Sequence, residues 1–180
     1  MQFIRNMDTV GIIAPKQWGK TTLTKHILNT VPRDKVIILD SNNEYKGFNN
    51  RFLPESYDYQ ELERFIKYGR QFTNITLIMD DVDLFVNPRQ QEGEFKKLLI
   101  NASHQNIGVI YSAKRAETIN KLLFMETKHL FMGSLWSKKD IYNLSGVYKK
   151  KELLLSLPRY AFLYRNRDTQ EESILKVTPL

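Results

Sequence analysis

Short runs of apolar residues alternate along the chain with segments in which apolar residues recur every three or four positions. The runs lie at residues 9–14, 36–39, 75–79, 107–111 and 129–132. Their length and their β-branched residues predict buried strands. Strands that are apolar without interruption are typical of a parallel sheet that is covered on both faces.

Helix-period segments lie between these strands. The first helix is expected from about Lys20 to Thr30, with Leu23, Ile27 and Val31 facing inward. Further helices are predicted by three groups of apolar residues: Leu62, Phe65 and Ile66; Phe95, Leu98, Leu99 and Ala102; and Ile119, Leu122 and Leu123. Alternating strands and helices predict an α/β fold, whose ligands bind beyond the carboxyl ends of the strands.

The chain closes on a different pattern. Two apolar runs, Tyr160–Tyr164 and Ser173–Val177, flank the polar segment 165–170, which predicts a β-hairpin. We therefore expect a three-layer α/β architecture with a mostly parallel central sheet and a C-terminal β-hairpin. The sequence shows no internal repeat and no Gly/Ser linker, so residues 1–180 are expected to form a single domain.

The composition gives the chain a net positive charge and excludes several classes of protein. The formal net charge is +7 and the sequence pI is about 9.5, with basic residues crowded into the last quarter. This balance favours a polyanionic partner such as nucleic acid, or else a solvated lysine-rich surface. The absence of cysteine excludes disulfides and thiolate zinc sites and fits a cytoplasmic chain. No apolar run approaches the roughly 18 residues of a membrane span, and the N-terminus lacks the order of a secretory signal.

A glycine-lysine turn follows the first predicted strand. The stretch APKQWGKTT ends in Gly-Lys-Thr, although alanine stands at its first position, where glycine is usual. A phosphate-binding loop needs converging backbone N–H groups, a lysine for the outer phosphates and a hydroxyl for magnesium, between a strand and a helix. We therefore predict that nucleotide is bound by Ala14, Pro15, Lys16, Gln17, Trp18, Gly19, Lys20, Thr21 and Thr22.

Two side chains are unusual in such a loop. Lys16 either adds charge near the γ-phosphate or is simply solvated. Trp18 either stacks on a base or on a neighbouring subunit, or packs the loop. The sequence leaves both alternatives open.

An acid doublet ends the third predicted strand. The segment ITLIMDD places Asp80 and Asp81 where a magnesium-binding carboxylate is expected. We predict that Thr21 and Asp80 bind Mg²⁺ and that Asp81 orients or activates water. In small-molecule kinases the magnesium carboxylate often ends the second strand, which would nominate Asp40. The position of the doublet on the third strand favours the translocating ATPases.

Three stretches resemble the HerA-type DNA-translocating ATPases. These stretches are VIILDSNNEY with its Asp-x-x-x-Glu-Tyr pattern, the acid pair in LIMDDVDLF, and NIGVIYSAKRAETINKLL. Together with the loop they follow that family's order and spacing over roughly residues 8–178. The short chain and closing hairpin look most similar to the viral genome-packaging ATPases of the FtsK/HerA superfamily, which are P-loop NTPases of the RecA/ASCE-like type.

The resemblance implies a homo-oligomeric ring, often of six subunits, that hydrolyses ATP with Mg²⁺ while double-stranded DNA passes through its centre. Capsid or portal components would be further partners, in the host cytoplasm or the virion. It also implies that Lys20 and Thr21 hold phosphate and magnesium, that Asp80 supports the ion, and that Asp81 replaces the catalytic glutamate.

The chain also departs from the family pattern. Lys114 aligns with the family's sensor glutamine, and Ser112 is a strand-end substitute. The family places a trans-acting arginine just before the fourth strand, where this chain has Asn101-Ala102-Ser103-His104. Arg115 is the first candidate for a replacement and Arg89 the second.

Two other functions are compatible with the sequence. A nucleoside or nucleotide kinase would use Asp40 and Glu44 as acceptor-site acids, but no arginine-rich lid is evident. A nucleotide-gated DNA-binding or assembly module would bind ATP and hydrolyse it weakly, as expected if no neighbour supplies an arginine.

Overall fold

The computed structural model describes residues 4, 7–86, 93–119, 121–135, 137–144 and 146–179. The strands are β1 (Thr9–Ile13), β2 (Val36–Leu39), β3 (Arg51–Phe52), β4 (Ile75–Met79), β5 (Ile107–Ala113), β6 (His129–Met132), β7 (Ala161–Asn166) and β8 (Glu172–Lys176). The α-helices are α1 (Lys20–Leu28), α2 (Tyr59–Gly69), α3 (Glu94–Asn101), α4 (Lys121–Glu126) and α5 (Lys138–Asn143).

All these strands form one sheet in the order β3-β2-β4-β5-β1-β6-β7-β8. The first six strands pair in parallel, and β7 pairs antiparallel with both β6 and β8. The α/β class, the mostly parallel sheet and the closing hairpin are therefore confirmed. β5 lies between β1 and β4, so the carboxyl ends of these three strands meet at one edge, where Ile13 pairs with Ala113 and Met79 with Tyr111.

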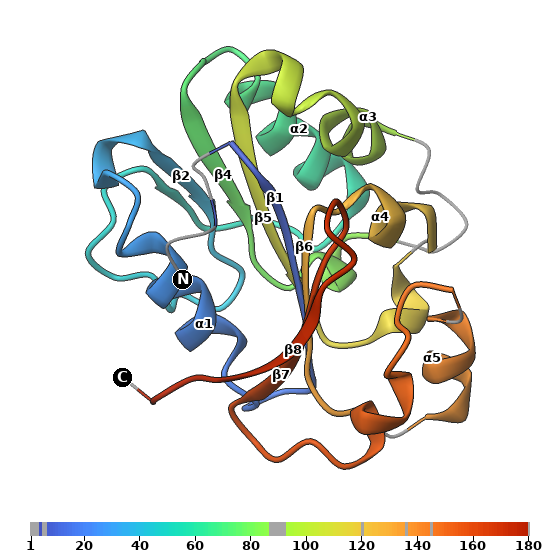
Figure 1. The fold of residues 1–180 in the computed structure, drawn as a ribbon. Helices are drawn as coiled ribbons and strands as arrows, with labels where there is room; N and C mark the ends of the chain where they lie inside the picture. Colours follow the sequence, from blue (N-terminus) through green and yellow to red (C-terminus); the bar gives the residue numbers. More distant parts are fainter. Residues whose placement is uncertain are drawn as a thin grey trace.

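Helices cover both faces of the sheet, which gives the three layers (Figure 1). On one face, α1 packs Leu23, Ile27 and Leu28 against residues of β1, β2 and β5. On the other face lie α2, α3 and α4, where Phe65, Phe95, Leu98 and Phe124 join the larger core cluster. Both sides of every central strand are thus buried, which explains why apolar residues predominate at successive positions instead of alternating with polar ones.

The element boundaries differ from the sequence prediction where local signals are weak. β3 is two residues long and α5 is a short helix, and neither was predicted. β5 continues to Ala113, which places Ser112 inside the strand. β7 begins at Ala161, so Tyr160 stands before the hairpin rather than within it.

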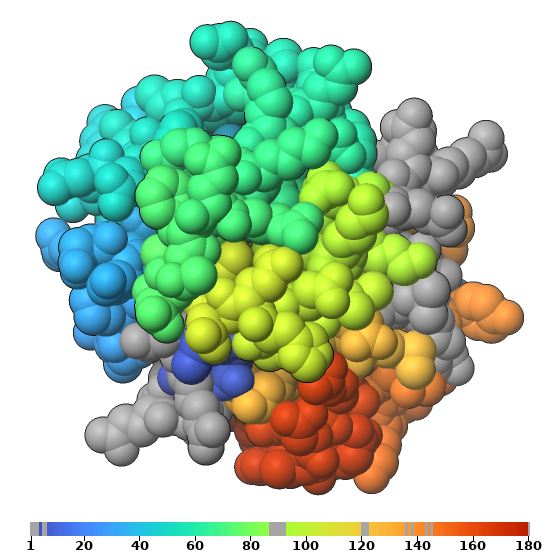
Figure 2. Space-filling view, turned by 90° about the horizontal axis from the view of Figure 1, so that it is seen from above, coloured from blue at the N-terminus to red at the C-terminus, as the bar shows by residue number. Residues whose placement is uncertain are grey.

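The amino ends of the parallel strands form the opposite edge of the sheet. Figure 2 looks onto this end, where the segment after α2 (green), the segment before β5 (yellow) and the hairpin turn (red) lie on one face. The stretch 101–104 runs from the end of α3 towards the amino end of β5, at this edge of the sheet. Among the described residues, no helix is long and apolar enough to cross a bilayer.

Candidate functional site

The loop between β1 and α1 has the backbone geometry of a phosphate cradle. Gln17 and Gly19 both adopt positive φ, at 64° and 90°, which turns the chain sharply before α1. The helix then begins with a hydrogen bond from Leu23 N to Gly19 O of 2.8 Å. No acidic residue occupies the first turn of α1, so the helix N-terminus is free to interact with an anion.

Ala14 occupies the loop position where glycine is usual because its conformation does not require glycine. It is fully buried and has no positive φ. The space for its methyl group comes from Gly133, which follows β6. A Cβ on Gly133 would lie 2.6 Å from the Ala14 Cβ. A glycine just past the end of the neighbouring strand thus compensates for the alanine in the loop.

Lys20 links the loop to the acid doublet. Its Nζ lies 3.1 Å from Ala14 O and 3.5 Å from Asp81 Oδ1. The side chain is almost completely buried. The structure therefore brings the phosphate loop and the acid doublet into contact, although they follow different strands. These strands, β1 and β4, both flank β5.

Asp80 is a buried carboxyl with one good hydrogen bond. Ser112 Oγ donates to Asp80 Oδ1 at 2.8 Å and accepts from Asp81 N at 2.8 Å. Burial, followed by the charge of Asp81, raises the pKa of Asp80 to about 6. The Ser112 hydroxyl is buried, and its two hydrogen bonds hold the acid doublet in position.

Asp81 is held in a strained conformation between two lysines. Its φ is 49°, in the left-handed region that non-glycine residues rarely adopt. Lys114 Nζ lies 3.1 Å from Oδ2, to which Asn42 Nδ2 also donates at 2.9 Å. Burial acts to raise the pKa of Asp81, but Lys20, Asn42 and Lys114 together lower it below its usual value. Asp81 is therefore ionised at neutral pH, and its buried Oδ1 has no hydrogen-bond donor.

The loop after β2 adds Asn42, which the sequence analysis did not name, and Glu44, which it named only for the kinase alternative. Asp40 is fully buried and accepts hydrogen bonds from Glu44 N at 2.9 Å and Tyr45 N at 3.0 Å. It also pairs with Arg51 at 3.1 Å. This carboxylate shapes the loop that carries Asn42 to the acid doublet and Glu44 to the hydroxyl of Thr21. The Asp-x-x-x-Glu-Tyr pattern was the available signal for this arrangement.

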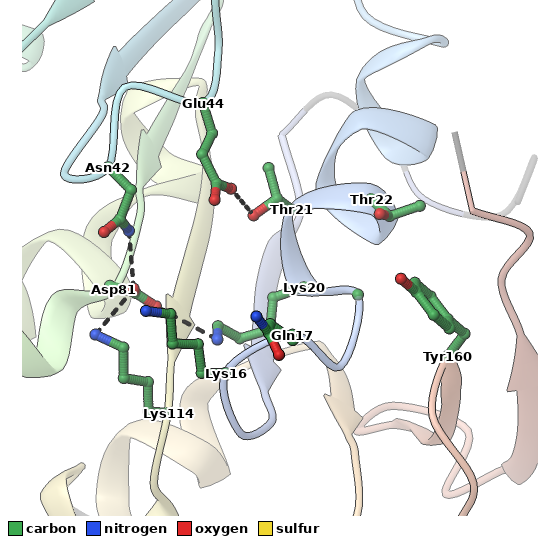
Figure 3. Close-up of a pocket in the computed structure, with 11 residues that line it drawn as sticks. Lys16, Gln17, Lys20, Thr21, Thr22, Asn42, Glu44, Asp81, Lys114 and Tyr160 are labelled. Atoms are coloured by element: carbon green, nitrogen blue, oxygen red, sulfur yellow. Dashed lines mark hydrogen bonds and ion pairs between the residues drawn. The ribbon is translucent and has the colours of Figure 1, made fainter.

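These groups surround one open cleft of about 380 Å³. It is lined by Lys16, Gln17, Gly19, Lys20, Thr21, Thr22, Asn42, Glu44, Asp81, Lys114 and Tyr160. Figure 3 shows Asn42, Asp81 and Lys114 gathered at one end of the cleft and Tyr160 at the other, beyond Thr22. The cleft is therefore polar along its length, with the charged groups concentrated at one end.

The donor set suits a magnesium ion that keeps most of its ligands from phosphate and water. Among the described residues, no three His, Cys, Asp or Glu side chains converge on one point. Mg²⁺ commonly takes only one or two carboxylates from a protein. The Thr21 hydroxyl lines the cleft, and Glu44 places a carboxylate against it. The candidate carboxylate of Asp80 is buried next to Asp81 and does not itself line the cleft.

Other predicted residues lie outside this cleft. Trp18 packs against the core cluster on the α1 face, as expected from loop packing rather than from base stacking. Arg115 pairs with Glu117 at 2.9 Å, and 68% of its side chain is exposed. It lines a neighbouring cleft of about 390 Å³ that shares Lys16 and Lys114 with the first. Arg89 lies outside the described residues.

Solved structures share this fold over nearly the whole chain. The genome packaging NTPase B204 of Sulfolobus turreted icosahedral virus 2, in complex with ATP-gammaS, is 18% identical, with a TM-score of 0.85 and coverage of 98% of this chain and 100% of that one. The DNA-packaging ATPase B204 of Sulfolobus turreted icosahedral virus is 20% identical, with a TM-score of 0.84 and coverage of 97% and 100%. The pCW3 conjugation coupling protein TcpA is 12% identical, with a TM-score of 0.69 and coverage of 96% and 60%.

The sequence itself matches no family model and no curated protein. At these identities the structural likeness establishes the fold alone, which this chain shares with the genome packaging NTPase B204 and with TcpA.

Proposed function

We propose that this chain is an ATPase that binds ATP and Mg²⁺ in the cleft and uses hydrolysis to move double-stranded DNA, as the motor subunit that packages a viral genome. The observation that carries the proposal is the 3.5 Å separation of Lys20 Nζ and Asp81 Oδ1. A phosphate-binding loop and the ionised Asp81 share one cleft at the carboxyl edge of the sheet, which is where nucleotides bind in such folds.

Four residues have proposed roles in ATP hydrolysis. Lys20 and the N–H groups at the start of α1 bind the phosphates. Thr21 and Asp80 would hold Mg²⁺, which when bound neutralises charge on the phosphates. Asp81 orients the attacking water and accepts its proton, and the lowered pKa keeps it ionised for that task. When Lys20 turns to the phosphates it leaves Asp81, whose Oδ1 then becomes available to water.

Lys114 is suited to stabilise charge on the terminal phosphate, because its Nζ reaches the same end of the cleft as Asp81. Arg115 is our candidate for a residue that acts on the site of a neighbouring subunit, since its side chain is largely exposed. An arginine in that role contributes about 10³ to 10⁵ in rate.

Two observations support the proposal of a DNA motor: the described function of the structural neighbours and the net positive charge of this chain. Two of them are described as packaging ATPases. The net charge of +7 suits a polyanion. We further propose a homo-oligomeric ring, hexameric as the resemblance implies, that works with capsid or portal components in the host cytoplasm or virion.

Phosphate release with and without duplex DNA tests both parts. We expect hydrolysis that DNA stimulates in the wild type, and loss of hydrolysis in Lys20→Ala. Lys25→Ala is the matched control, because Lys25 lies in the same helix but does not line the cleft. Unchanged hydrolysis in Lys20→Ala would contradict the site. Hydrolysis without any DNA binding or stimulation would contradict the motor and leave the ATPase standing.

The salt dependence of DNA binding is an independent check. Each duplex phosphate that the protein neutralises contributes about −0.9 to the slope of log affinity against log salt. A basic DNA-binding surface therefore predicts a steep decline in affinity between low and physiological salt. A flat response would contradict that surface as the contact.

The kinase alternative is disfavoured by Asp40. This carboxylate is fully buried and holds its own loop, so it is not available to an acceptor substrate. A weakly hydrolysing, nucleotide-gated module is favoured by a different observation: both Lys20 and Lys114 pair with Asp81, the residue that would act on water. Single-turnover hydrolysis at protein concentrations that form rings distinguishes the module from the motor.

A further inference from the structure

The residue that precedes the C-terminal hairpin lies against the phosphate loop. A Cβ built on Gly19 would lie 2.5 Å from Cδ1 of Tyr160 and 3.0 Å from its Cε1. The Tyr160 side chain is only partly buried and lines the nucleotide cleft. Phe162 and Tyr164, the next aromatic residues of the same run, are buried in the core. Tyr160 therefore faces the cleft, whereas its two neighbours pack the sheet.

The backbone of Tyr160 is strained, and surrounding hydrogen bonds fix the strain. Its φ is 62°, which is unfavourable for an aromatic residue. Tyr160 O accepts a hydrogen bond of 2.8 Å from Val177 N, and Ala161 N donates to Pro158 O at 3.2 Å. Residues held in such conformations concentrate at ligand sites, where the strain aims a side chain. Here it directs the ring against Gly19.

The two ends of the cleft differ in chemistry. Asp81 and Lys114 lie at the charged end, and Tyr160 lies at the other end, beyond Thr22 (Figure 3). Phosphates bound at Lys20, with the terminal phosphate toward Lys114, leave the nucleoside to extend past Thr22. The base of the nucleotide, which is a flat ring, would then lie next to the aromatic side chain of Tyr160.

We propose that Tyr160 stacks on the base of the bound nucleotide. The inference rests on the proposed nucleotide-binding function and deepens it by assigning the base subsite. Tyr160 is a binding residue and takes no part in the chemical step. Stacking on an aromatic ring tolerates every base, so it supplies affinity for a nucleoside triphosphate over a bare polyphosphate chain.

Calorimetric binding of two ligands with Mg²⁺ tests this assignment. ATPγS contains the base, and inorganic tripolyphosphate carries the phosphate chain alone. Stacking on an aromatic side chain is lost on alanine substitution with an affinity change of about five- to 150-fold. We expect Tyr160→Ala to weaken ATPγS binding by a factor in this range and to leave tripolyphosphate binding unchanged. Tyr160→Phe should bind both ligands as the wild type does. Tyr142→Ala removes a tyrosine that is 78% exposed on α5 and should change neither affinity.

Other outcomes overturn the proposal in distinguishable ways. Equal loss of both ligands in Tyr160→Ala would mean that the ring only supports the phosphate loop. Unchanged ATPγS binding would mean that the ring does not touch the base. If the wild type bound neither ligand, or if Lys20→Ala bound both as the wild type does, the nucleotide site itself would fail.

A second variant, in which the backbone strain is relieved, distinguishes a loss of base stacking from misfolding. Glycine adopts a φ of 62° freely, so Tyr160→Gly should unfold at a temperature no lower than Tyr160→Ala. Selective loss of ATPγS binding in this folded variant would support stacking. Retention of full ATPγS affinity would refute it.

Discussion

We predict that the ionised carboxylate of Asp80, a proposed ligand of Mg²⁺, lowers the stability of the folded protein. Burial and the charge of Asp81 raise the pKa of Asp80 from 3.8 to about 6. The folded protein therefore holds this proton more tightly than the unfolded chain does. The stability contributed by the protonated carboxyl is fully present below pH 3.8 and is lost as the pH rises through about 6.

The size of the effect follows from the shift. Each pKa unit corresponds to about 1.36 kcal/mol, so ionised Asp80 lowers the free energy of unfolding by roughly 3 kcal/mol above pH 6. Asp80→Asn has no carboxyl to ionise and keeps an oxygen that can accept the Ser112 hydroxyl. We therefore expect the variant to exceed the wild type by roughly 3 kcal/mol at pH 7.5, or by roughly 6–12 °C in melting temperature. The difference should nearly vanish at pH 4.

Urea and thermal unfolding of the nucleotide-free protein in EDTA, from pH 4 to pH 8, measure this difference. Asp34→Asn makes the same chemical change at an exposed residue and should shift stability by no more than about 0.5 kcal/mol. The reasoning is refuted if Asp80→Asn is no more stable than the wild type at pH 7.5, or if its advantage is the same at pH 4. The more stable variant should also lose Mg²⁺-dependent ATP binding, since an amide is a poorer ligand than a carboxylate.

Three further substitutions have defined outcomes. Lys114→Met should lower the single-turnover rate of ATP hydrolysis by about 10²-fold with little change in ATP affinity, as for other positioned charge-stabilising groups. An unchanged rate would show that Lys114 takes no part in the reaction. Gly19→Ala should abolish nucleotide binding while the circular dichroism spectrum stays native, because a Cβ there meets Tyr160 at 2.5 Å and φ is 90°; normal ATP affinity would show that the loop adapts. Asp8→Ala should lower the free energy of urea unfolding by about 1–3 kcal/mol, because it removes the partner of His129 Nε2 at 3.0 Å in the core; equal stability would mean that His129 finds another partner.

The sequence predicts those parts of the fold that depend on buried periodicity. β2, β4 and β6 have the predicted bounds, because each is a short and mostly apolar segment in which every residue is buried. The phosphate loop and the acid doublet were found because each is contiguous and follows a strand. The prediction that both lie at one edge needed only the parallel direction of the strands.

The residues that were missed, or were assigned only to the kinase alternative, reach the site through tertiary contacts. Asn42 and Glu44 lie in a loop whose shape depends on a buried aspartate and on an arginine seven residues or more away. Tyr160 belongs to an apolar run that was predicted as a strand of the hairpin, and the other two aromatic residues of that run are buried. No local pattern distinguishes the third, because its exposure depends on where β7 begins and on a positive φ.

The antiparallel direction of β7 explains how the end of the chain reaches a site built by its beginning. In a parallel sheet, only the carboxyl ends of strands face the nucleotide cleft. β7 runs opposite to β6, with Met132 paired to Leu163, so its amino end lies at that same edge. Val177 N, just past the end of β8, then bonds to Tyr160 O and fixes the residue that enters β7. Had the sheet continued in parallel, the segment leading into its next strand would lie at the opposite edge, and no side chain there could contact Gly19.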